Sequence, residues 1–270
     1  MPDVTAREAL LRAHDEDLRT EAELAGATHR DRIGPLWLGR YGERGFVSYR
    51  DLGGITGAEL DALIGAALDH FRSDPEVTSF EWKTRGHDAP PDLGVHLARA
   101  GLVEQQQETV MIGEAVRLAG RAAVPSDVVL RRAGDTGQLA GDVAAVGRLH
   151  REVFGPDSPN MDERLLRVLG AEPPMDEVWL AEADGVVVCA GRLTRVPGTR
   201  FAGLFGGATA EEFRHRGVYR ALTAARAHSA IALGASLVYA ECTPFSRPVL
   251  ERSGLEAVTT TTPWVWRRRG

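Results

Sequence analysis

The stretch from Gly206 to Leu222 reads as the end of a strand, a basic turn containing a glycine, and the start of an alanine-rich helix. Its apolar residues recur at the spacing of one helical face, at Val218, Ala221, Leu222 and Ala225. We expect this helix to end near Leu233, because Gly234 follows. No Ser, Thr, Asn or Asp lies between Arg214 and Arg220 to cap the first amides of the helix. Free amides at a helix N-terminus attract anions, so this turn predicts a phosphate site.

The stretch 128–266 resembles the GNAT superfamily of acyl-CoA N-acyltransferases. The pyrophosphate loop of that family reads Gln/Arg-x-x-Gly-x-Gly/Ala, and the matching residues are Arg214, His215, Arg216, Gly217, Val218 and Tyr219. Tyr219 departs from the pattern: its backbone amide still donates, but its side chain reduces the room for the pyrophosphate. The resemblance implies acetyl-CoA as co-substrate and assigns its binding to the following residues: Gly207, Ala208, Thr209, Arg214, His215, Arg216, Gly217, Val218, Tyr219 and Arg220.

The rest of the second half follows the order of the same family. Two apolar runs meet at Asp184-Gly185, which predicts a β-hairpin. A short strand is expected at Leu237–Cys242, followed by a helix that Ser246 caps. The resemblance implies that this helix and a last strand, 255–266, complete a mixed sheet. It also implies that the sheet splays beside the strand that carries Glu241, to admit the thioester.

An internal repeat divides the chain. The order strand, turn, helix and strand from Ser79 to Ile112 echoes the order from Val238 to Trp266. Upstream, an expected strand at 46–50 and a helix at 57–71 mirror the strand and helix around the basic turn. We therefore expect an α/β (α+β) fold of tandem GNAT-like lobes, each a mixed, mostly antiparallel sheet flanked by helices.

The length and composition agree with two lobes of ordinary size. The chain has 270 residues, 43% of them hydrophobic, which is enough for two moderate cores. The lobes are expected at residues 1–122 and 123–270. Their junction is expected in 120–126, a stretch with a proline and low strand and helix character.

The first lobe lacks the basic turn. In its place Thr56-Gly57-Ala58-Glu59 reads as a capping box, in which side-chain oxygens satisfy the free amides of the following helix. We therefore expect a degenerate lobe without a cofactor loop. It resembles the N-terminal lobes of two-lobed GNAT proteins at Glu81-Trp82-Lys83 and Gly86-His87-Asp88.

Amide formation from a thioester needs a base for the amine, a donor for the carbonyl oxygen and an acid for the departing thiolate. The resemblance assigns the oxygen to backbone amides at 207–210. Glu241 is the candidate base, directly or through water, and the alternative for it is an ion pair with Arg247 or exposure to solvent. Leu250 stands where the family often carries a tyrosine acid, so Ser246 or water is the candidate acid.

We therefore expect an acetyl-CoA-dependent N-acetyltransferase that transfers an acyl group to a primary amine of a small molecule or peptide. The alternative is a non-catalytic acyl-CoA-binding or sensor module, which the missing tyrosine favours. A nucleotide site unrelated to CoA is disfavoured, because neither Gly-x-Gly-x-x-Gly nor Gly-x-x-x-x-Gly-Lys-Ser/Thr occurs at a strand–helix junction.

Charge and patterning exclude other classes. A net charge of −6 argues against a nucleic-acid surface, despite Arg267-Arg268-Arg269 near the end. No apolar run reaches ~18 residues and no signal-peptide pattern is present, so we expect no membrane contact and a cytoplasmic protein, as a monomer or homodimer. Histidine and cysteine spacings predict no metal site. Cys189 and Cys242 are expected to be reduced thiols within strands.

Overall fold

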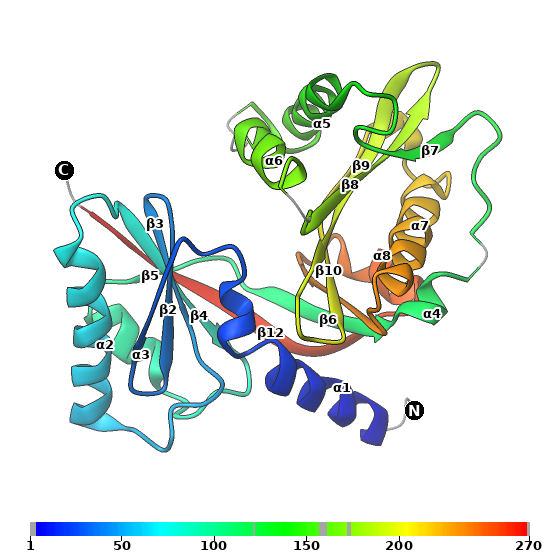
Figure 1. The fold of residues 1–270 in the computed structure, drawn as a ribbon. Coiled ribbons are helices and arrows are strands. Elements are labelled where there is room, and N and C mark those ends of the chain that lie inside the picture. Colours follow the sequence, from blue (N-terminus) through cyan, green and yellow to red (C-terminus); the bar gives the residue numbers. More distant parts are fainter. Residues whose placement is uncertain (1–3, 121, 157–160, 172–173, 269–270) are drawn as a thin grey trace.

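One mixed sheet runs through the whole molecule. The computed structural model describes residues 4–120, 122–156, 161–171 and 174–268. Within them, twelve mostly antiparallel strands follow the order β1-β2-β3-β4-β12-β6-β11-β10-β9-β8-β7, with β5 beside β12. Figure 1 shows two halves side by side, each with helices packed on its strands. The expected α/β fold is confirmed. Arg121 of the expected junction and Arg269 of the basic tail lie outside the described residues.

The first half packs its strands against α2 and α3. Its elements are α1 (Val4–Asp17), the 3-10 helix η1 (Glu21–Leu24), β1 (His29–Ile33), β2 (Leu36–Tyr41), β3 (Arg44–Ser48), α2 (Gly57–Ser73), β4 (Ser79–Arg85), α3 (Leu93–Arg99) and β5 (Val103–Glu104). Apolar residues alternate along β4, so Phe80 and Trp82 point into the core and are at most 2% exposed. The Phe80 ring stacks on Phe71 of α2, with centroids 4.7 Å apart.

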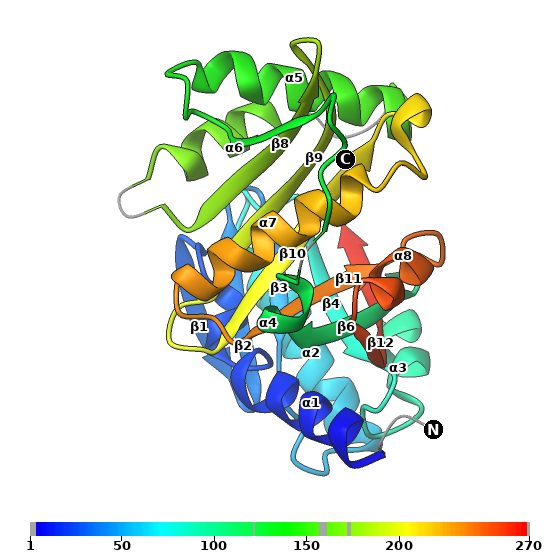
Figure 2. The ribbon, with the colours of Figure 1, turned by 90° about the vertical axis from the view of Figure 1, so that its right-hand side faces the viewer.

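The second half carries the predicted basic turn. Its elements are β7 (Val129–Arg132), α5 (Leu139–Phe154), α6 (Asp162–Leu169), β8 (Asp176–Ala183), β9 (Val186–Arg195), β10 (Phe201–Thr209), the 3-10 helix η2 (Glu211–Phe213), α7 (Val218–Ala232), β11 (Leu237–Cys242) and α8 (Arg247–Arg252). Figure 2 shows α7 crossing the strands of this half. The predicted hairpin is confirmed, because β8 and β9 pair across Asp184 and Gly185, which both have positive φ. Gly234, with φ 86°, follows α7 as expected.

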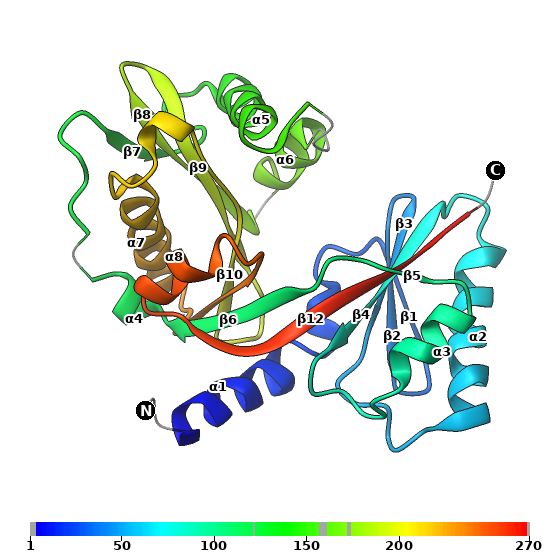
Figure 3. The same ribbon diagram turned by 180° about the vertical axis from the view of Figure 1, so that it is seen from behind.

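Two strands are shared between the halves. β6 (Glu108–Glu114), which precedes the short helix α4 (Ala115–Leu118), pairs along β11 of the second half. β12 (Glu256–Arg267) pairs first with β6 and then with β4 of the first half. Figure 3 shows β6 and β12 running from one half of the molecule towards the other. The last strand therefore does more than complete the second lobe: its alternating Trp264 and Trp266 fill the core of the first.

The repeat is visible as two β-α-β units. β3 and β4, connected through α2, are parallel, and so are β10 and β11, connected through α7. The expected capping box at Thr56 is wrong, since no side chain caps α2. Gly57 has φ 55°, outside helical geometry, which takes the first turn out of register for the box. Ser246 precedes α8 without capping it, because its backbone is itself helical.

Candidate functional site

β10 separates from β11 in the middle of the sheet. The two strands pair in parallel only from Phe201 to Gly203, while β11 stays paired with β6 up to Cys242. On its other side β10 has a bulge between Phe205 and Ala208, where Gly206 takes φ 60°. Beyond Gly203, the edge of β10 that faces β11 therefore has no strand partner among the described residues. The expected splay of the sheet lies at this point.

The turn after β10 presents a row of backbone amides. Gly217, at the N-cap of α7, has φ 83°, and His215 has φ 61°. Across the described ranges, no carbonyl or side chain accepts a hydrogen bond from the amides of 215–220. The amide of Ala221 is the first to bond within the helix, to the Gly217 carbonyl at 3.0 Å. Such a concavity of amides at a helix N-terminus is suited to a pyrophosphate.

The basic side chains of the turn lie at the surface. Arg214 Nε donates to the Thr209 carbonyl at 3.2 Å, which braces the turn against the end of β10. Arg216 Nη2 donates to Asp127 Oδ2 at 2.6 Å, and this contact lowers the pKa of the Asp127 carboxyl. The other exposed basic side chains are His215 and Arg220. Arg214 thus ties the turn to the end of β10, and Arg216 ties it to Asp127, which precedes β7.

Tyr219 turns its ring inward, against the sheet. A Cβ atom at position 207 would lie 2.8 Å from the Tyr219 ring, so a larger residue there would have to displace the ring. The Arg226 guanidinium lies 5.5 Å from the centroid of the same ring. The half-buried ring packs on the cores on either side of α7. The tyrosine that departs from the family pattern therefore directs its bulk towards β10 and away from the row of amides.

Comparison with solved structures identifies the fold of the whole chain. No protein-family model and no curated protein matches it. A GCN5-related N-acetyltransferase from Kribbella flavida matches with a TM-score of 0.68 and 17% identity over 100% of this chain and 98% of its own. A tandem GNAT protein from the clavulanic acid biosynthesis pathway matches with a TM-score of 0.56 and 16% identity over 86% of this chain and 78% of its own. The chain has the GNAT fold.

Another solved structure agrees with this assignment. A GCN5-related N-acetyltransferase from Sphaerobacter thermophilus matches with a TM-score of 0.62 and 16% identity, over 87% of this chain and 78% of its own. At such identities the likeness establishes the fold, and the chemistry has to be argued from the residues of this chain.

In this GNAT fold, Glu241 lies beside the splay and pairs with the first half. Its Oε2 accepts a hydrogen bond of 2.6 Å from Nζ of Lys83 on β4. Lys83 Nζ also lies 3.7 Å from Glu81. Burial alone would raise the pKa of Glu241, but the charges of Lys83 and Arg85 outweigh it and hold this pKa below its ordinary value. Glu241 is therefore an ionised carboxylate with one oxygen committed.

Two residues that the sequence did not single out share this face. Glu108 on β6 is half-buried, and among the described residues its carboxyl forms no hydrogen bond or ion pair. Burial and the charge of Glu241 raise its pKa. Tyr239 precedes Glu241 by two positions on β11, so both side chains point to one face of the strand. The sequence signal was present in this alternation, but the pairing of β6 with β11 was not foreseen.

The other expected chemical groups at the end of β11 lie elsewhere. Arg247, the alternative partner of Glu241, instead pairs with Glu251 at 2.8 Å within α8. Ser246 is exposed, and the Phe245 ring beside it is 91% exposed. Leu250, at the position of the family's tyrosine, is buried in the core under α8. The described residues near β11 therefore offer an exposed hydroxyl and no tyrosine from α8 as a proton donor.

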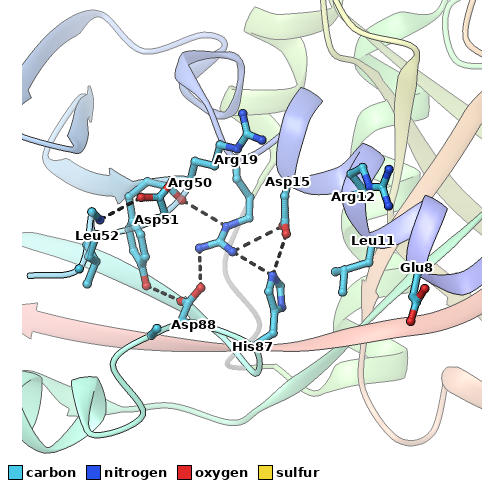
Figure 4. Close-up of a pocket in the computed structure, with 14 residues that line it drawn as sticks. Glu8, Leu11, Arg12, Asp15, Arg19, Arg50, Asp51, Leu52, His87 and Asp88 are labelled. Atoms are coloured by element: carbon cyan, nitrogen blue, oxygen red, sulfur yellow. Dashed lines mark hydrogen bonds and ion pairs between the residues drawn. The ribbon is translucent and has the colours of Figure 1, made fainter.

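A pocket of about 520 Å³ lies in the first half, between α1 and the loops after β3 and β4. Figure 4 shows the Arg19 side chain between Asp15, His87 and Asp88, which line this pocket. Arg19, 2% exposed, donates to the Tyr49 carbonyl at 3.2 Å and to Asp88 at 2.6 Å. Tyr49 follows β3 as the basic turn follows β10. Arg19 thus ties the loop after β3 to the loop after β4.

Two classes of site can be assessed for the described ranges. No group of three or more His, Cys, Asp or Glu residues there is arranged to hold a metal ion. No helix there is both long enough and apolar enough to cross a bilayer. The two cysteines, Cys189 on β9 and Cys242 on β11, are buried and free.

Proposed function

We propose that this protein is an N-acetyltransferase that uses acetyl-CoA and acts on a primary amine of a small molecule or peptide. The observation that carries the proposal is the row of free amides at 215–220, set at the mouth of the opening between β10 and β11. A pyrophosphate is the group that such amides bind. An open strand edge has unpaired amides and carbonyls, and these can hold an acyl thioester.

Each proposed step uses a group of the second half. The amides of 215–220, with Arg214, Arg216 and Arg220 around them, hold the pyrophosphate. Amides at 207–210 donate to the thioester oxygen as it gains charge. The acceptor ammonium gives a proton to Glu241, and the neutral amine then forms a C–N bond as the C–S bond breaks. The second proton of the nitrogen passes to water, so that the product is a neutral amide. The departing thiolate takes a proton from water or from Ser246.

The first half is proposed to bind no acetyl-CoA. Its loop after β3 has no Arg-x-x-Gly-x-Gly/Ala, because Ile55 stands at the last position of that pattern. Arg19 pairs with Asp88 beside this loop. Its proposed task is to close the acceptor side of the second half. The test is mass spectrometry of a mixture of amines incubated with protein and acetyl-CoA. Protein-dependent acetylated products are expected, and their absence despite bound acetyl-CoA would refute catalysis.

A second candidate is a non-catalytic acyl-CoA sensor. It is favoured by the buried Leu250 at the tyrosine position and by the exposure of Ser246. The same incubation separates the two, because a sensor binds acetyl-CoA and leaves every amine unmodified. The thiolate of CoA is a good enough leaving group that a missing acid does not exclude turnover.

A further inference from the structure

Lys83 is the single lysine of the chain, since 31 of its 32 Lys and Arg residues are arginine. It is also the residue of the first half that contacts Glu241. Its side chain is 16% exposed, and its ammonium lies over the Phe46 ring at 5.8 Å. An ammonium is a compact point charge, whereas a guanidinium needs room for a planar fork. The ammonium of Lys83 lies between the carboxylates of Glu81 and Glu241 and faces both.

The ion pair spans the two halves of the sheet. β12 and β6 lie between β4 and β11 in the strand order. Three spacings of about 4.8 Å separate such strands in a flat sheet, or roughly 14 Å. Contact at 2.6 Å between Lys83 and Glu241 thus depends on the two long side chains meeting over the same face of the shared strands. β6 of the first half pairs with β11 of the second, and β12 of the second half pairs with β4 of the first. This strand exchange brings Lys83 of the first half to the proposed reaction centre.

The following inference rests on the proposed function. We propose that Lys83 is a positioning residue for Glu241: it fixes Oε2 of the carboxylate and keeps the group ionised, so that Oε1 receives the proton of the acceptor ammonium. The proton passes from the nitrogen to Oε1, and the freed electron pair of the nitrogen forms the new C–N bond as the C–S bond of the thioester breaks and CoA leaves as the thiolate. The reaction centre is then completed by both halves of the chain.

The charges around Glu241 make this role measurable. Burial raises the pKa of Glu241, and Lys83 opposes that effect most strongly. The other charged or titratable groups that interact with the pair of Lys83 and Glu241 are Arg85 and Glu81 of β4, His14 of α1, Glu23 of η1, Glu108 of β6 and Tyr239 of β11. Removing the ammonium takes away the strongest effect that lowers the Glu241 pKa, so that burial raises this pKa against Arg85 and His14. The ionised, active form of Glu241 then appears only at higher pH.

The first test is the pH dependence of kcat/KM for Lys83→Met, which keeps the length of the side chain without its charge. The acid limb of the profile should move to higher pH, with a loss of roughly tenfold or more near neutral pH. Lys83→Arg should restore part of the rate and return the limb towards the wild type. Arg40→Met, which removes an ion pair with Asp74 in the same half, should change neither. An unshifted limb in a folded Lys83→Met protein would overturn the proposal.

The second test needs no activity. Because the chain has one lysine, protein labelled with ¹³C and ¹⁵N in lysine gives one side-chain signal. The pKa of Lys83 read from that signal should lie above the ordinary value of about 10.4, since Glu241 and Glu81 outweigh burial. It should fall in Glu241→Gln, which removes the nearer carboxylate. A pKa at or below the ordinary value in the wild type would contradict the inferred contact.

Glu241→Gln and Glu108→Gln separate this inference from the proposed function. Glu241→Gln should lower turnover roughly 100-fold while acetyl-CoA binding is retained. If Glu108→Gln lowers turnover and Glu241→Gln does not, Lys83 positions a group without a role in proton transfer, and the inference fails. If neither the wild type nor these variants bind acetyl-CoA, the proposed function is refuted, and the inference about Lys83 with it.

Discussion

The ring of Tyr219 and the backbone of Gly207 lie against each other, so that a Cβ atom at position 207 would be 2.8 Å from the ring. This contact joins the first turn of α7 to the bulge of β10. It fixes the distance between the two parts of the proposed acetyl-CoA site, the row of amides and the open strand edge. A glycine at 207 is therefore required by a particular neighbour and not by its backbone angles.

Gly207→Ala should accordingly lower the free energy of unfolding by about 1–3 kcal/mol through overpacking. The same change in a Tyr219→Ala background should cost much less, because the ring that it meets is gone. Urea unfolding of the four proteins gives the coupling between the two positions. Equal costs in both backgrounds would show that the contact does not limit position 207.

Acetyl-CoA at a hundredfold excess over its dissociation constant should stabilise the wild-type protein by about 2.7 kcal/mol. Gly217→Val should abolish this gain, because φ 83° is strained for a β-branched residue and the amides lose their alignment. Replacing Arg214 and Arg216 by Glu should do the same through charge. Thr56→Ala is the control: no cap bond is lost there, so the gain should persist. A full gain in the loop variants would place the site elsewhere.

The sequence predicted what depends on neighbours along the chain. The apolar spacing from Val218 to Ala225 and the glycine at 234 are local signals, and α7 has those limits. The hairpin at Asp184-Gly185 needs positive φ at both residues, which its residue types favour. These elements and the GNAT fold could be predicted.

Contacts between distant segments could not be predicted in this way. β12 pairs with the first half because Trp264 and Trp266 are buried in the core of that half. The alternation of apolar residues along a strand does not show which half provides the core. The pairing of Glu241 with Lys83 follows from that exchange, so Arg247, the nearer basic residue in sequence, was the wrong partner. The capping box at Thr56 failed because a four-residue pattern does not fix the φ of Gly57.

The strand exchange also has a consequence for fragments. The boundary between 122 and 123 stays a prediction, and a fragment of residues 123–270 lacks β6, which pairs with all six residues of β11. This fragment should expose the apolar residues that β6 covers and be less soluble and less stable than the whole chain. Circular dichroism and light scattering would check this. A monomeric, cooperatively unfolding fragment would show that β11 does not need β6.

Asp142 provides a pH-dependent test of stability. It accepts bonds of 2.7 and 2.6 Å from Arg131 and one of 2.8 Å from the Gly134 amide, and the Arg131 bonds hold its pKa below the ordinary value. A lowered pKa in the folded state stabilises the protein above the unfolded pKa, near 3.9, and the gain is lost as pH falls through the folded value. Arg131 keeps its pair with Glu182 in this variant, so Asp142→Asn should cost about 1–3 kcal/mol at pH 7 and less below about pH 4. An equal cost at pH 7 and pH 3, measured in urea, would contradict this.

The most direct measurement of the central claim is steady-state release of thiol from acetyl-CoA across a panel of primary amines. The wild type should release thiol in an amine-dependent way, and Gly217→Val should release it at least 100-fold more slowly at the same acetyl-CoA concentration. Binding of acetyl-CoA without thiol release for any amine would contradict an acetyltransferase and leave the sensor. Amine-dependent release that Gly217→Val leaves unchanged would contradict the assignment of the cofactor site to the turn before α7.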